Sequence, residues 1–415
     1  MGARLGILAA AALALTPRVA RASAQELYGV GPRDLALAGA ATALGDHAGA
    51  LYYDPAGLAA APRVRFYAVW LQADAHLTID GKTAPGVQPM RATSFGFVLP
   101  LPLRGPLENR LTLGLLLHSP NDKLIRVYSR PAQEPQFVIL QNHAQVMGLF
   151  AGGALRLSPA VAIGAGTRLL ANVGARVRVV GGERGVENTT TGFLTTTMAP
   201  MASVRVAPPG KPWRAALTWR HKLAQKFATP TSSDLYGFSA PTPGLEATTC
   251  FVPSELVAGG AWETPAWGFT VDLAGKRWSE FPDPTVGIGR IAPASAPFPR
   301  FHDTVAPRAG IEWTRPAPRA TVVLRGGYGF EPTPVPAQHD DYSFYDDDRH
   351  VLGAGAGIAV PWRNGHLRVE LGAQAHLLAV RRWHKDAGKV PAGTPLDHRT
   401  AGQTIAASAA MSFEY

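Results

Sequence analysis

Apolar and polar residues alternate over long stretches of this sequence. In residues 69–79 every odd position is apolar, and from Gln72 onward the even positions are polar. The same alternation returns in residues 161–179 and 367–379. Side chains that alternate with a period of two lie on opposite faces of a β-strand, so each stretch predicts a strand with one apolar face. Stretches of about ten residues or more exceed a usual soluble strand and suit a tilted strand that crosses a membrane.

The composition supports a membrane protein without spanning helices. Hydrophobic residues make up 46% of the chain and charged residues only 17%, against about 25% charged in a soluble protein. Beyond the N-terminus no stretch approaches the ~20 consecutive apolar residues of a transmembrane helix. A closed barrel is the other structure that satisfies its backbone hydrogen bonds within a bilayer. The sequence therefore predicts an all-β fold, a transmembrane antiparallel β-barrel.

The charge and the cysteine content exclude several classes of function. The net charge of +10 is scattered, without a basic run or helix, and this favours solvated loops and lipid headgroups over nucleic acid. The single cysteine, Cys250, excludes an intramolecular disulfide and a multi-cysteine metal site. We expect no cofactor, no metal and no nucleic-acid partner.

The N-terminus has the features of a secretory signal peptide. Arg4 precedes an apolar run over residues 5–15, and Ala22-Ser23-Ala24 has the small-x-small form of a cleavage site. We therefore expect residues 1–24 to be removed; an ordinary apolar helix is the alternative. The mature chain would begin at Gln25.

Counting alternating segments predicts about fourteen strands. They are expected near residues 63–79, 91–103, 109–118, 141–157, 160–180, 190–207, 212–227, 251–263, 266–278, 302–314, 319–331, 348–361, 365–383 and 401–415. Tight turns are expected at 158–159, 265 and 315–318, and long loops at 119–140, 228–250, 279–301, 331–347 and 384–400. Short periplasmic turns and long outer loops are typical of outer-membrane barrels.

Aromatic residues fit the same interpretation. Eight of the nine tryptophans lie near proposed strand ends, where aromatic girdles meet the membrane interfaces; they are Trp70, Trp213, Trp262, Trp267, Trp278, Trp313, Trp362 and Trp383. The last alternating segment ends at Tyr415, on its apolar phase. A terminal aromatic resembles the signal that barrel-assembly machinery recognises, so we expect that machinery and outer-membrane lipid, including lipopolysaccharide, as partners.

Residues 25–62 do not alternate. Residues 35–43 are small and apolar, and Asp54 before Pro55 can cap a short helix. The segment is too apolar for a disordered tail, so it predicts a plug inside the barrel, with the barrel itself at residues 63–415.

Three sequence blocks resemble the FadL/TodX family, outer-membrane transporters of long-chain fatty acids and aromatic hydrocarbons. The first block covers residues 39–43, Asp46-His47-Ala48 and 52–58, and it is similar to the family's N-terminal hatch. The second covers residues 324–336 and 346–350, and the third residues 267–281. The resemblance implies a fourteen-stranded barrel closed by the hatch, in the outer membrane of a Gram-negative cell. It also implies passive, hatch-gated uptake of hydrophobic small molecules.

The resemblance places the gate at Asp54, Pro55, Ala56 and Gly57. The family carries Asn-Pro-Ala where this chain has Asp54-Pro55-Ala56. The aspartate is expected either to pair with an arginine in the lumen or to make gating respond to pH.

Further site residues follow from the same resemblance. A kinked strand beside a lateral exit is implied near residues 113–120, with Gly114 and Pro120 as weak points in its backbone. Arg300 and Arg325 are candidates to bind a cargo carboxylate. Only Arg300 lies where fatty-acid members place a basic residue, which leaves room for an uncharged cargo. The arginines on the polar phase of strands are expected as lumen salt-bridge partners; they are Arg168, Arg176, Arg178, Arg325 and Arg368.

The sequence contains no catalytic motif: no G-x-S-x-G, H-E-x-x-H, C-x-x-C or phosphate loop. We therefore expect no enzyme. Two alternatives remain open. A lipase-like barrel would bring Ser, His and Asp or Asn together on one outer face, and a structural or adhesive barrel would not transport. The acidic group at residues 340–348 is expected to be solvated or paired with Arg349 rather than to bind Ca²⁺.

Overall fold

The computed structural model describes residues 24–45, 49–122, 125–127, 132–141, 144–182, 185–235, 238–282 and 298–415. Residues 1–23 of the predicted signal peptide, which covers residues 1–24, lie outside these residues, and so does the Asp46-His47-Ala48 part of the first block.

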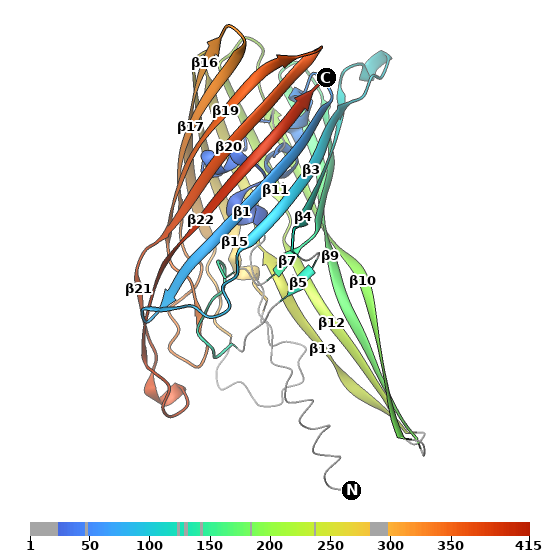
Figure 1. Ribbon diagram of the computed structural model, residues 1–415, viewed down its shortest axis with the longest axis vertical. Coiled ribbons are helices and arrows are strands. Elements are labelled where there is room, and N and C mark those ends of the chain that lie inside the picture. Colours follow the sequence, from blue (N-terminus) through green and yellow to red (C-terminus); the bar gives the residue numbers. More distant parts are fainter. Residues whose placement is uncertain are drawn as a thin grey trace.

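Within the described residues, fourteen antiparallel strands close into a barrel (Figure 1). Closure is made by the first and last strands, whose pairing runs from Arg65 opposite Glu414 to Ile79 opposite Thr400. The predicted fold class is thus confirmed. The barrel strands are β1 (Arg65–Ile79), β3 (Met90–Pro100), β4 (Leu111–Pro120), β8 (Gly148–Arg156), β9 (Val161–Gly182), β10 (Gly185–Val206), β11 (Trp213–Arg220), β14 (Ser254–Glu263), β15 (Trp267–Arg277), β16 (Thr304–Ala317), β17 (Ala320–Glu331), β19 (Arg349–Trp362), β20 (Gly365–Leu378) and β22 (Asp397–Glu414).

The two ends of the barrel differ, as the sequence predicts. Short links join the strands at the end where Tyr415 lies, and we call this the short-turn end (Figure 1). The opposite, long-loop end carries the other connections. One predicted turn is displaced: β16 continues to Ala317 and β17 begins at Ala320, so Arg315 and Pro316 belong to a strand.

The long-loop end also contains strands that the sequence does not predict. Residues 228–250, expected as a loop, lie mostly in the hairpin of β12 (Leu223–Leu235) and β13 (Phe238–Val252). This prediction is wrong because prolines and threonines in the segment hide its alternation. β12 pairs in parallel with the outer part of β9, and Figure 1 shows the four strands β9, β10, β12 and β13 projecting beyond the barrel.

The remaining elements are short. They are the strands β2 (Lys82–Thr83), β5 (Ile125–Val127), β6 (Gln136–Phe137), β7 (Ala144–Val146), β18 (Phe344–Tyr345) and β21 (Arg381–His384), and the 3-10 helices η2 (Gly105–Leu107), η3 (Trp278–Glu280) and η4 (Ala387–Lys389).

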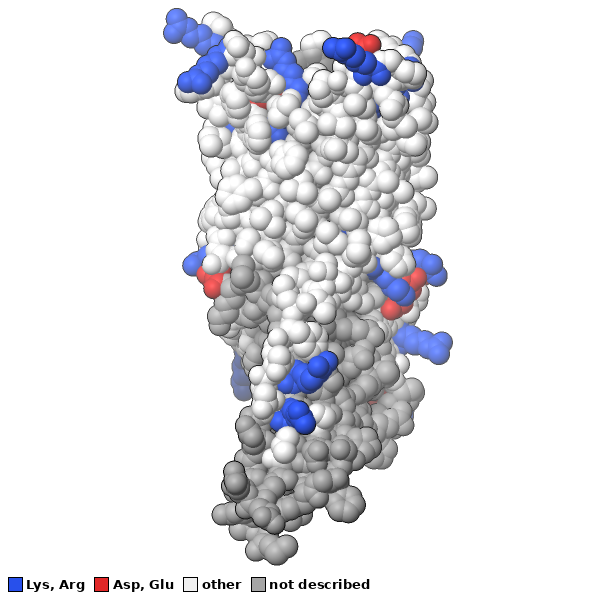
Figure 2. Space-filling model, turned by 90° about the vertical axis from the view of Figure 1, so that its right-hand side faces the viewer, with Lys and Arg blue, Asp and Glu red and all other residues white. Residues whose placement is uncertain are grey.

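An apolar belt surrounds the barrel. Large hydrophobic side chains such as Leu273, Val305 and Leu371 are 52%, 55% and 59% exposed on its exterior. Figure 2 shows a broad zone of one face almost without Lys, Arg, Asp or Glu, bordered by charged residues above and below. Such a belt is the lipid-facing surface of a barrel that spans a bilayer.

The tryptophans divide into two groups. Most are partly exposed on the barrel exterior, and Trp267 contacts Trp313 near the short-turn end, with ring centroids 6.5 Å apart. This matches an interfacial girdle. The prediction is wrong for Trp278 and Trp383, which are 4% and 3% exposed, because residues of the long-loop end pack over them.

Residues 24–45 and 49–61 lie in the barrel lumen and include several short helices (Figure 1). We call this stretch the N-terminal segment. Its elements are α2 (Ala24–Tyr28), α3 (Pro32–Ala36), α4 (Ala50–Tyr53) and η1 (Pro55–Ala60). None of the helices in the described ranges is long and apolar enough to cross a membrane.

A hydrophobic core closes the lumen between this segment and the long-loop end. Tyr28 of α2 and Ile139 belong to it together with aromatic residues from five connections between barrel strands. Phe281 stacks on Phe301 at 4.4 Å, and β6 pairs with β18 across two of the connections. In the part of the chain that the structure describes, packed apolar side chains therefore cover the lumen at the long-loop end.

Candidate functional site

The four residues that the resemblance assigns to the gate lie directly against the barrel wall. The backbone N–H of Ala56 donates to Ser203 Oγ of β10 at 2.7 Å. A Cβ on Gly164 of β9 would lie 2.1 Å from the Ala56 nitrogen and 2.4 Å from the Pro55 carbonyl carbon. Only glycine fits there. The segment around Pro55 is thus held by a hydrogen bond and by a close backbone approach.

Asp54 forms a buried ion pair with the wall. Arg205 of β10 lies 3.0 Å from its carboxylate and donates a second hydrogen bond to the Leu44 carbonyl at 2.9 Å. The Asp54 side chain is fully buried. Burial raises the pKa of the Asp54 carboxyl, while Arg205 acts in the opposite direction. Of the two expectations for this aspartate, pairing with a lumen arginine is what the structure contains.

The turn that contains Gly57 packs closely against Gly45 because neither residue has a side chain. A Cβ on Gly57 would lie 2.5 Å from the Cα of Gly45, whose own φ is +71°. Two glycines thus bring two stretches of the N-terminal segment into backbone contact beside Arg205.

A second network connects α3 to the opposite wall. Arg33 donates to both carboxylate oxygens of Glu312, at 2.9 and 2.5 Å. Arg325 also contacts Glu312, at 2.5 Å, and Glu370, at 2.8 Å. Arg325 is therefore part of the anchor for the N-terminal segment. Its other predicted role, binding a cargo carboxylate, remains a prediction.

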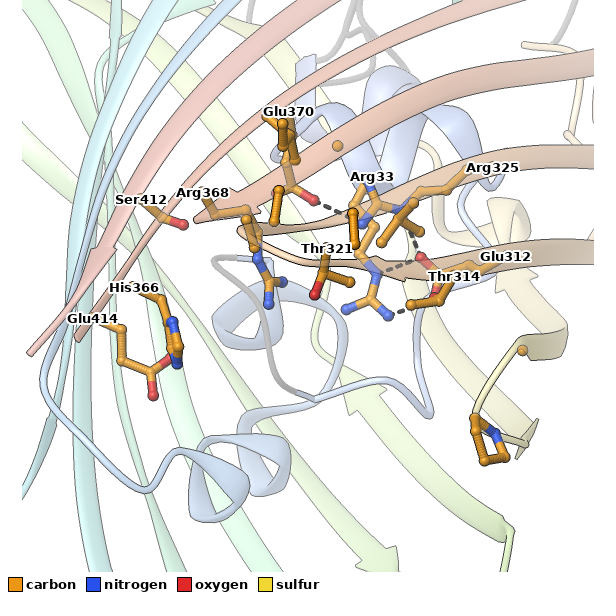
Figure 3. Close-up of a pocket in the computed structure, with 18 of the residues that line it drawn as sticks. Arg33, Glu312, Thr314, Thr321, Arg325, His366, Arg368, Glu370, Ser412 and Glu414 are labelled. Atoms are coloured by element: carbon orange, nitrogen blue, oxygen red, sulfur yellow. Dashed lines mark hydrogen bonds and ion pairs between the residues drawn. The ribbon is translucent and has the colours of Figure 1, made fainter. Parts of the chain in front are cut away.

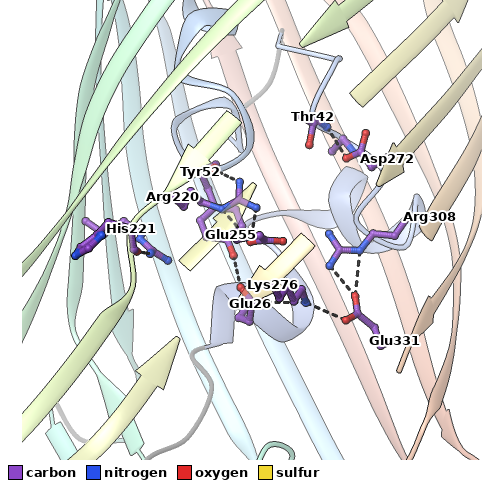
Figure 4. Close-up of polar contacts among 12 residues, drawn as sticks. Glu26, Thr42, Tyr52, Arg220, His221, Glu255, Asp272, Lys276, Arg308 and Glu331 are labelled. Carbon is purple, nitrogen blue, oxygen red and sulfur yellow. Dashed lines mark hydrogen bonds and ion pairs between the residues drawn. The ribbon is translucent and has the colours of Figure 1, made fainter. Parts of the chain in front are cut away.

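A third network joins α2 and α4 to β11, β14, β15 and β17 (Figure 4). Lys276 lies 2.7 Å from Glu26 and 2.9 Å from Glu331. Arg220 pairs with Glu255 at 2.6 Å and donates to the Tyr52 carbonyl at 2.9 Å. These buried charges face one another, which is the condition under which charges are tolerated in a water-poor interior.

Asp272 of β15 holds the middle of the N-terminal segment. Its carboxylate accepts the backbone N–H groups of Ala41 and Thr42 at 3.1 and 3.0 Å. Together the contacts fix the segment to strands on several sides of the barrel.

Lumen-facing glycines form a seat for α3 and the turn after it. A Cβ on Gly327 would lie 2.3 Å from the Leu37 carbonyl carbon, and one on Gly353 would lie 2.3 Å from the Leu35 oxygen. Further positions of this kind lie on neighbouring strands. The glycine seat comprises Gly310, Gly327, Gly353, Gly355 and Gly372. The sequence analysis did not identify these residues, although glycine at alternate positions of a strand indicates a closely approaching backbone.

Two interior cavities are very small. One, of about 20 Å³, lies between the N-terminal segment and Arg308, and the other, also about 20 Å³, lies among Gln25, His118 and Cys250. A water molecule requires about 10–15 Å³ measured this way. Neither of these two cavities admits an organic solute.

A larger, polar cavity of about 540 Å³ opens at the short-turn end (Figure 3). Arg33, Glu312, Arg325 and Glu370 form its inner boundary, and Arg368 and Thr321 also line it. Arg368 was expected to form a salt bridge, but the described residues contain no ion pair to it. The charged lining makes this end of the lumen hydrophilic.

The other candidate residues are not brought to one place. Gly114 lies on β4 where a Cβ would approach Leu51 to 3.1 Å, so it faces the N-terminal segment. β4 pairs without a register shift with β3 from Thr112 to Pro120, and with β8 from Leu111 to His118. A lateral opening at Gly114 and Pro120 therefore remains a prediction. Arg300 is exposed at the long-loop end.

The remaining arginines have varied surroundings. Arg168 donates to the His221 carbonyl at 2.6 Å, whereas Arg176 and Arg178 are exposed on the projecting part of β9. In the acidic group, Asp346 pairs with Arg349 at 3.0 Å. No group of three or more potential metal ligands occurs within the described residues.

One serine–histidine pair bears on the lipase alternative. Ser94 Oγ and His118 Nδ1 are 2.9 Å apart, and both residues are buried in the barrel interior. The alternative requires such residues on an outer face, which this pair does not occupy.

Comparison with solved structures identifies the fold. The chain is similar to a FadL homologue from Pseudomonas aeruginosa, with a TM-score of 0.62, 11% identity and coverage of 96% of this chain and 100% of the other. It is also similar to the toluene transporter TodX from Pseudomonas putida (TM-score 0.53, 13% identity, 95% and 99% coverage). For the toluene transporter TbuX from Ralstonia pickettii the TM-score is 0.51, with 14% identity and 94% and 99% coverage. No family model and no curated protein matches the sequence. The chain therefore has the fold of these transporters, at low sequence identity.

Proposed function

We propose that this protein is an outer-membrane channel that takes up hydrophobic small molecules, and that its N-terminal segment is the gate. The observation that carries the proposal is the combination of a bilayer-spanning barrel with a lumen that contains its own residues 24–45 and 49–61. A structural or adhesive barrel has no need of such a filling, whereas a channel that must exclude polar solutes does.

The chemistry of the long-loop end favours an apolar cargo. The long-loop end presents an aromatic and aliphatic core in which Phe281, Phe301 and Phe298 stack. An apolar solute gains free energy by leaving water for such a surface. The solved transporters with this fold are named for toluene and monoaromatic hydrocarbons, which supports a neutral or weakly polar cargo.

Transport requires the N-terminal segment to move, since the interior cavities hold about one water molecule each. Movement is driven by binding and by the cargo gradient, because a ligand shifts a conformational equilibrium only through its differential affinity for the two states. No cofactor takes part in this mechanism.

The experiment is expression in a Gram-negative host that lacks its own channel for long-chain fatty acids. We expect the protein in the outer-membrane fraction, assembled by the host's barrel-assembly machinery beside lipopolysaccharide. Cells should take up radiolabelled toluene or oleic acid faster than cells with an empty vector. Deletion of residues 25–62 should admit polar antibiotics that the full chain excludes. Equal uptake with and without the protein, for both labelled compounds, would refute the proposal.

A further inference from the structure

The polar cavity at the short-turn end has the size of a ligand-binding pocket. Its volume is about 540 Å³, and small-molecule sites commonly enclose about 300–1,000 Å³. Strands β16, β17, β19 and β20 contribute to its wall, and Arg33 of α3 forms part of its inner boundary (Figure 3). The cavity therefore lies between the aqueous end of the lumen and the N-terminal segment. We call it the short-turn cavity.

Arg325 of β17 carries a buried donor at this cavity. Its Nε lies 2.5 Å from Glu312 and its Nη2 lies 2.8 Å from Glu370, but its Nη1 has no hydrogen-bond partner among the described residues. The Arg325 side chain is only 2% exposed. A buried guanidinium N–H without an acceptor costs free energy. A ligand atom that accepts its hydrogen bond therefore contributes more here than it would at a solvated arginine.

A glycine keeps the approach to this donor open. Gly357 of β19 also lines the cavity, and a Cβ at this position would lie 3.1 Å from Arg325 Nη1. Any other residue would place a carbon atom against that nitrogen. The absence of a side chain at Gly357 therefore leaves Nη1 accessible from the cavity.

Arg368 of β20 is a second cation in the same cavity. Within the described ranges it has no ion pair, and its row of the wall contains Thr321 of β17 and Ala359 of β19, which also line the cavity. Gly357 lies two residues from Ala359, so Nη1 of Arg325 and the row of Arg368 are about 7 Å apart along the strands. A carboxylate between them can accept hydrogen bonds from both arginines.

The charges of the lining leave an excess of positive charge. Arg319 and Arg368 are without an ion pair in the part of the chain that the structure describes, whereas the other charged residues of the lining are paired. The pairs are Arg33 and Arg325 with Glu312, Arg325 with Glu370, Arg65 with Glu414, and Arg214 with Glu263. Because these glutamates repel a second negative charge, the cavity favours a singly charged carboxylate over a phosphate.

Apolar side chains complete the lining. They include Ala320, Val323 and Pro361. A bare inorganic anion would leave most of the volume unfilled and these side chains without contacts. The cavity therefore fits an organic molecule with one carboxylate and an apolar body.

We propose that the short-turn cavity binds a small organic carboxylate between Arg325 and Arg368, and that this ligand holds the N-terminal segment in place. Arg33 completes the inner boundary only while α3 lies on the glycine seat. A ligand shifts a conformational equilibrium towards the state that binds it better, so an occupied cavity favours the seated segment. By linkage, movement of the segment weakens binding. This inference goes beyond the proposed function: it assigns a ligand that enters from the end opposite to the cargo and lowers uptake.

The first test is calorimetric titration of the full chain in detergent, at constant ionic strength, with benzoate as the probe. Benzyl alcohol has the same ring without the charge, and inorganic phosphate has the charge without the ring. We expect saturable binding of benzoate that is tighter than the binding of either other compound. No saturable binding of benzoate, or equal binding of benzyl alcohol, would overturn the proposal. Tighter binding of phosphate would overturn the assignment to an organic carboxylate.

Three variants locate the binding. Arg368→Gln removes the second cation, and Gly357→Ala places a Cβ 3.1 Å from Arg325 Nη1. Each should weaken benzoate binding about tenfold or more, the usual effect of losing a hydrogen bond to a charged group. Arg315→Gln is the matched control, because it removes an exposed positive charge near the same end of the barrel without touching the cavity. Equal affinity in Arg368→Gln and the unmodified protein, both with the same melting temperature, would place the binding elsewhere.

The second test measures how fast a protease cleaves the N-terminal segment of the folded protein. Saturating benzoate should slow cleavage several-fold in the unmodified protein and in Arg315→Gln, and should have no effect in Arg368→Gln. Unchanged or faster cleavage in the presence of benzoate would overturn the link between the ligand and the segment. Neither test involves uptake, so a negative result here leaves the proposed function intact, and a failure of uptake leaves these results standing.

Discussion

Arg205 of β10 holds Asp54 at 3.0 Å and the Leu44 carbonyl at 2.9 Å with one guanidinium group. The two acceptors belong to different turns of the N-terminal segment, on either side of residues 46–48. A single wall residue therefore fixes both turns. The chemistry at this point depends on the aspartate that replaces the asparagine of the family motif.

We expect Asp54→Ala to loosen the gate. It leaves Arg205 buried without its carboxylate, and removing one partner of a buried ion pair costs about 3–5 kcal/mol. The barrel should still form, but polar antibiotics should enter cells faster. The double variant Asp54→Ala/Arg205→Met removes both charges and should leak less than Asp54→Ala alone. Equal leakage of the single and double variants would show that the pair does not hold the gate.

The glycine seat predicts opposite results at two adjacent positions. Gly327→Ala places a Cβ 2.3 Å from the backbone of Leu37, whereas at Gly326, on the outer face, the nearest atom would be 3.8 Å away. We expect Gly327→Ala to displace α3, which would raise ion conductance in planar bilayers and expose the N-terminal segment to protease. Gly326→Ala should behave as the unmodified protein. Similar conductance in both variants would contradict the seat.

We expect the buried carboxyl of Asp347, at the long-loop end, to make the stability of the protein depend on pH. Burial raises the pKa of this carboxyl to about 7, with Asp346 adding to the rise and Thr400 opposing it. A carboxyl whose folded pKa lies above its unfolded value binds protons more tightly in the folded state, so its stabilising effect is present at acid pH. That effect is lost as the pH rises from about 4 to about 7. The melting temperature in detergent should therefore fall between pH 5 and pH 8.

Asp347→Asn provides the control for that effect. The amide oxygen can still accept the hydrogen bond from Thr400 Oγ1, which spans 2.8 Å to Asp347 Oδ1. We expect the melting temperature of the variant to change less across the same pH range. An equally steep change would assign the effect to other groups.

Two cargoes of different charge can distinguish the role of Arg300 from that of Arg325. Arg300 is exposed at the long-loop end, so Arg300→Ala should lower uptake of oleic acid and leave uptake of toluene unchanged. Arg325 is committed to Glu312 and Glu370, so Arg325→Ala should alter uptake of both compounds. Loss of oleic acid uptake alone in Arg325→Ala would instead assign the carboxylate to that residue.

The barrel could be predicted from the sequence because alternation is a local signal. In residues 69–79 and 367–379 the polarity of each residue indicates on which face of the strand its side chain lies. Counting such segments gives the number of strands. The hairpin of β12 and β13 was missed because its pairing is specified by neighbouring strands and not by its own pattern. Trp278 and Trp383 were wrongly assigned to the exposed aromatic girdle for a related reason. The sequence at a strand end does not show whether a connection folds over the side chains there.

The site was predictable in part. Asp54 was identified with two possible roles. Its pairing with Arg205, which is 151 residues away, is found in the structure, and a pH response of the gate remains a prediction. Local patterns identify elements, and contacts between distant residues decide what the elements do.

The distance along the chain between the N-terminal segment and its seat has a consequence for assembly. Arg33 and Glu312 are 279 residues apart, and the seat glycines lie between Gly310 and Gly372. Contacts between distant residues form slowly, because a long loop must close before they contribute. Helix α3 therefore lacks its seat until the strands that carry residues 310–372, in the last third of the chain, have assembled.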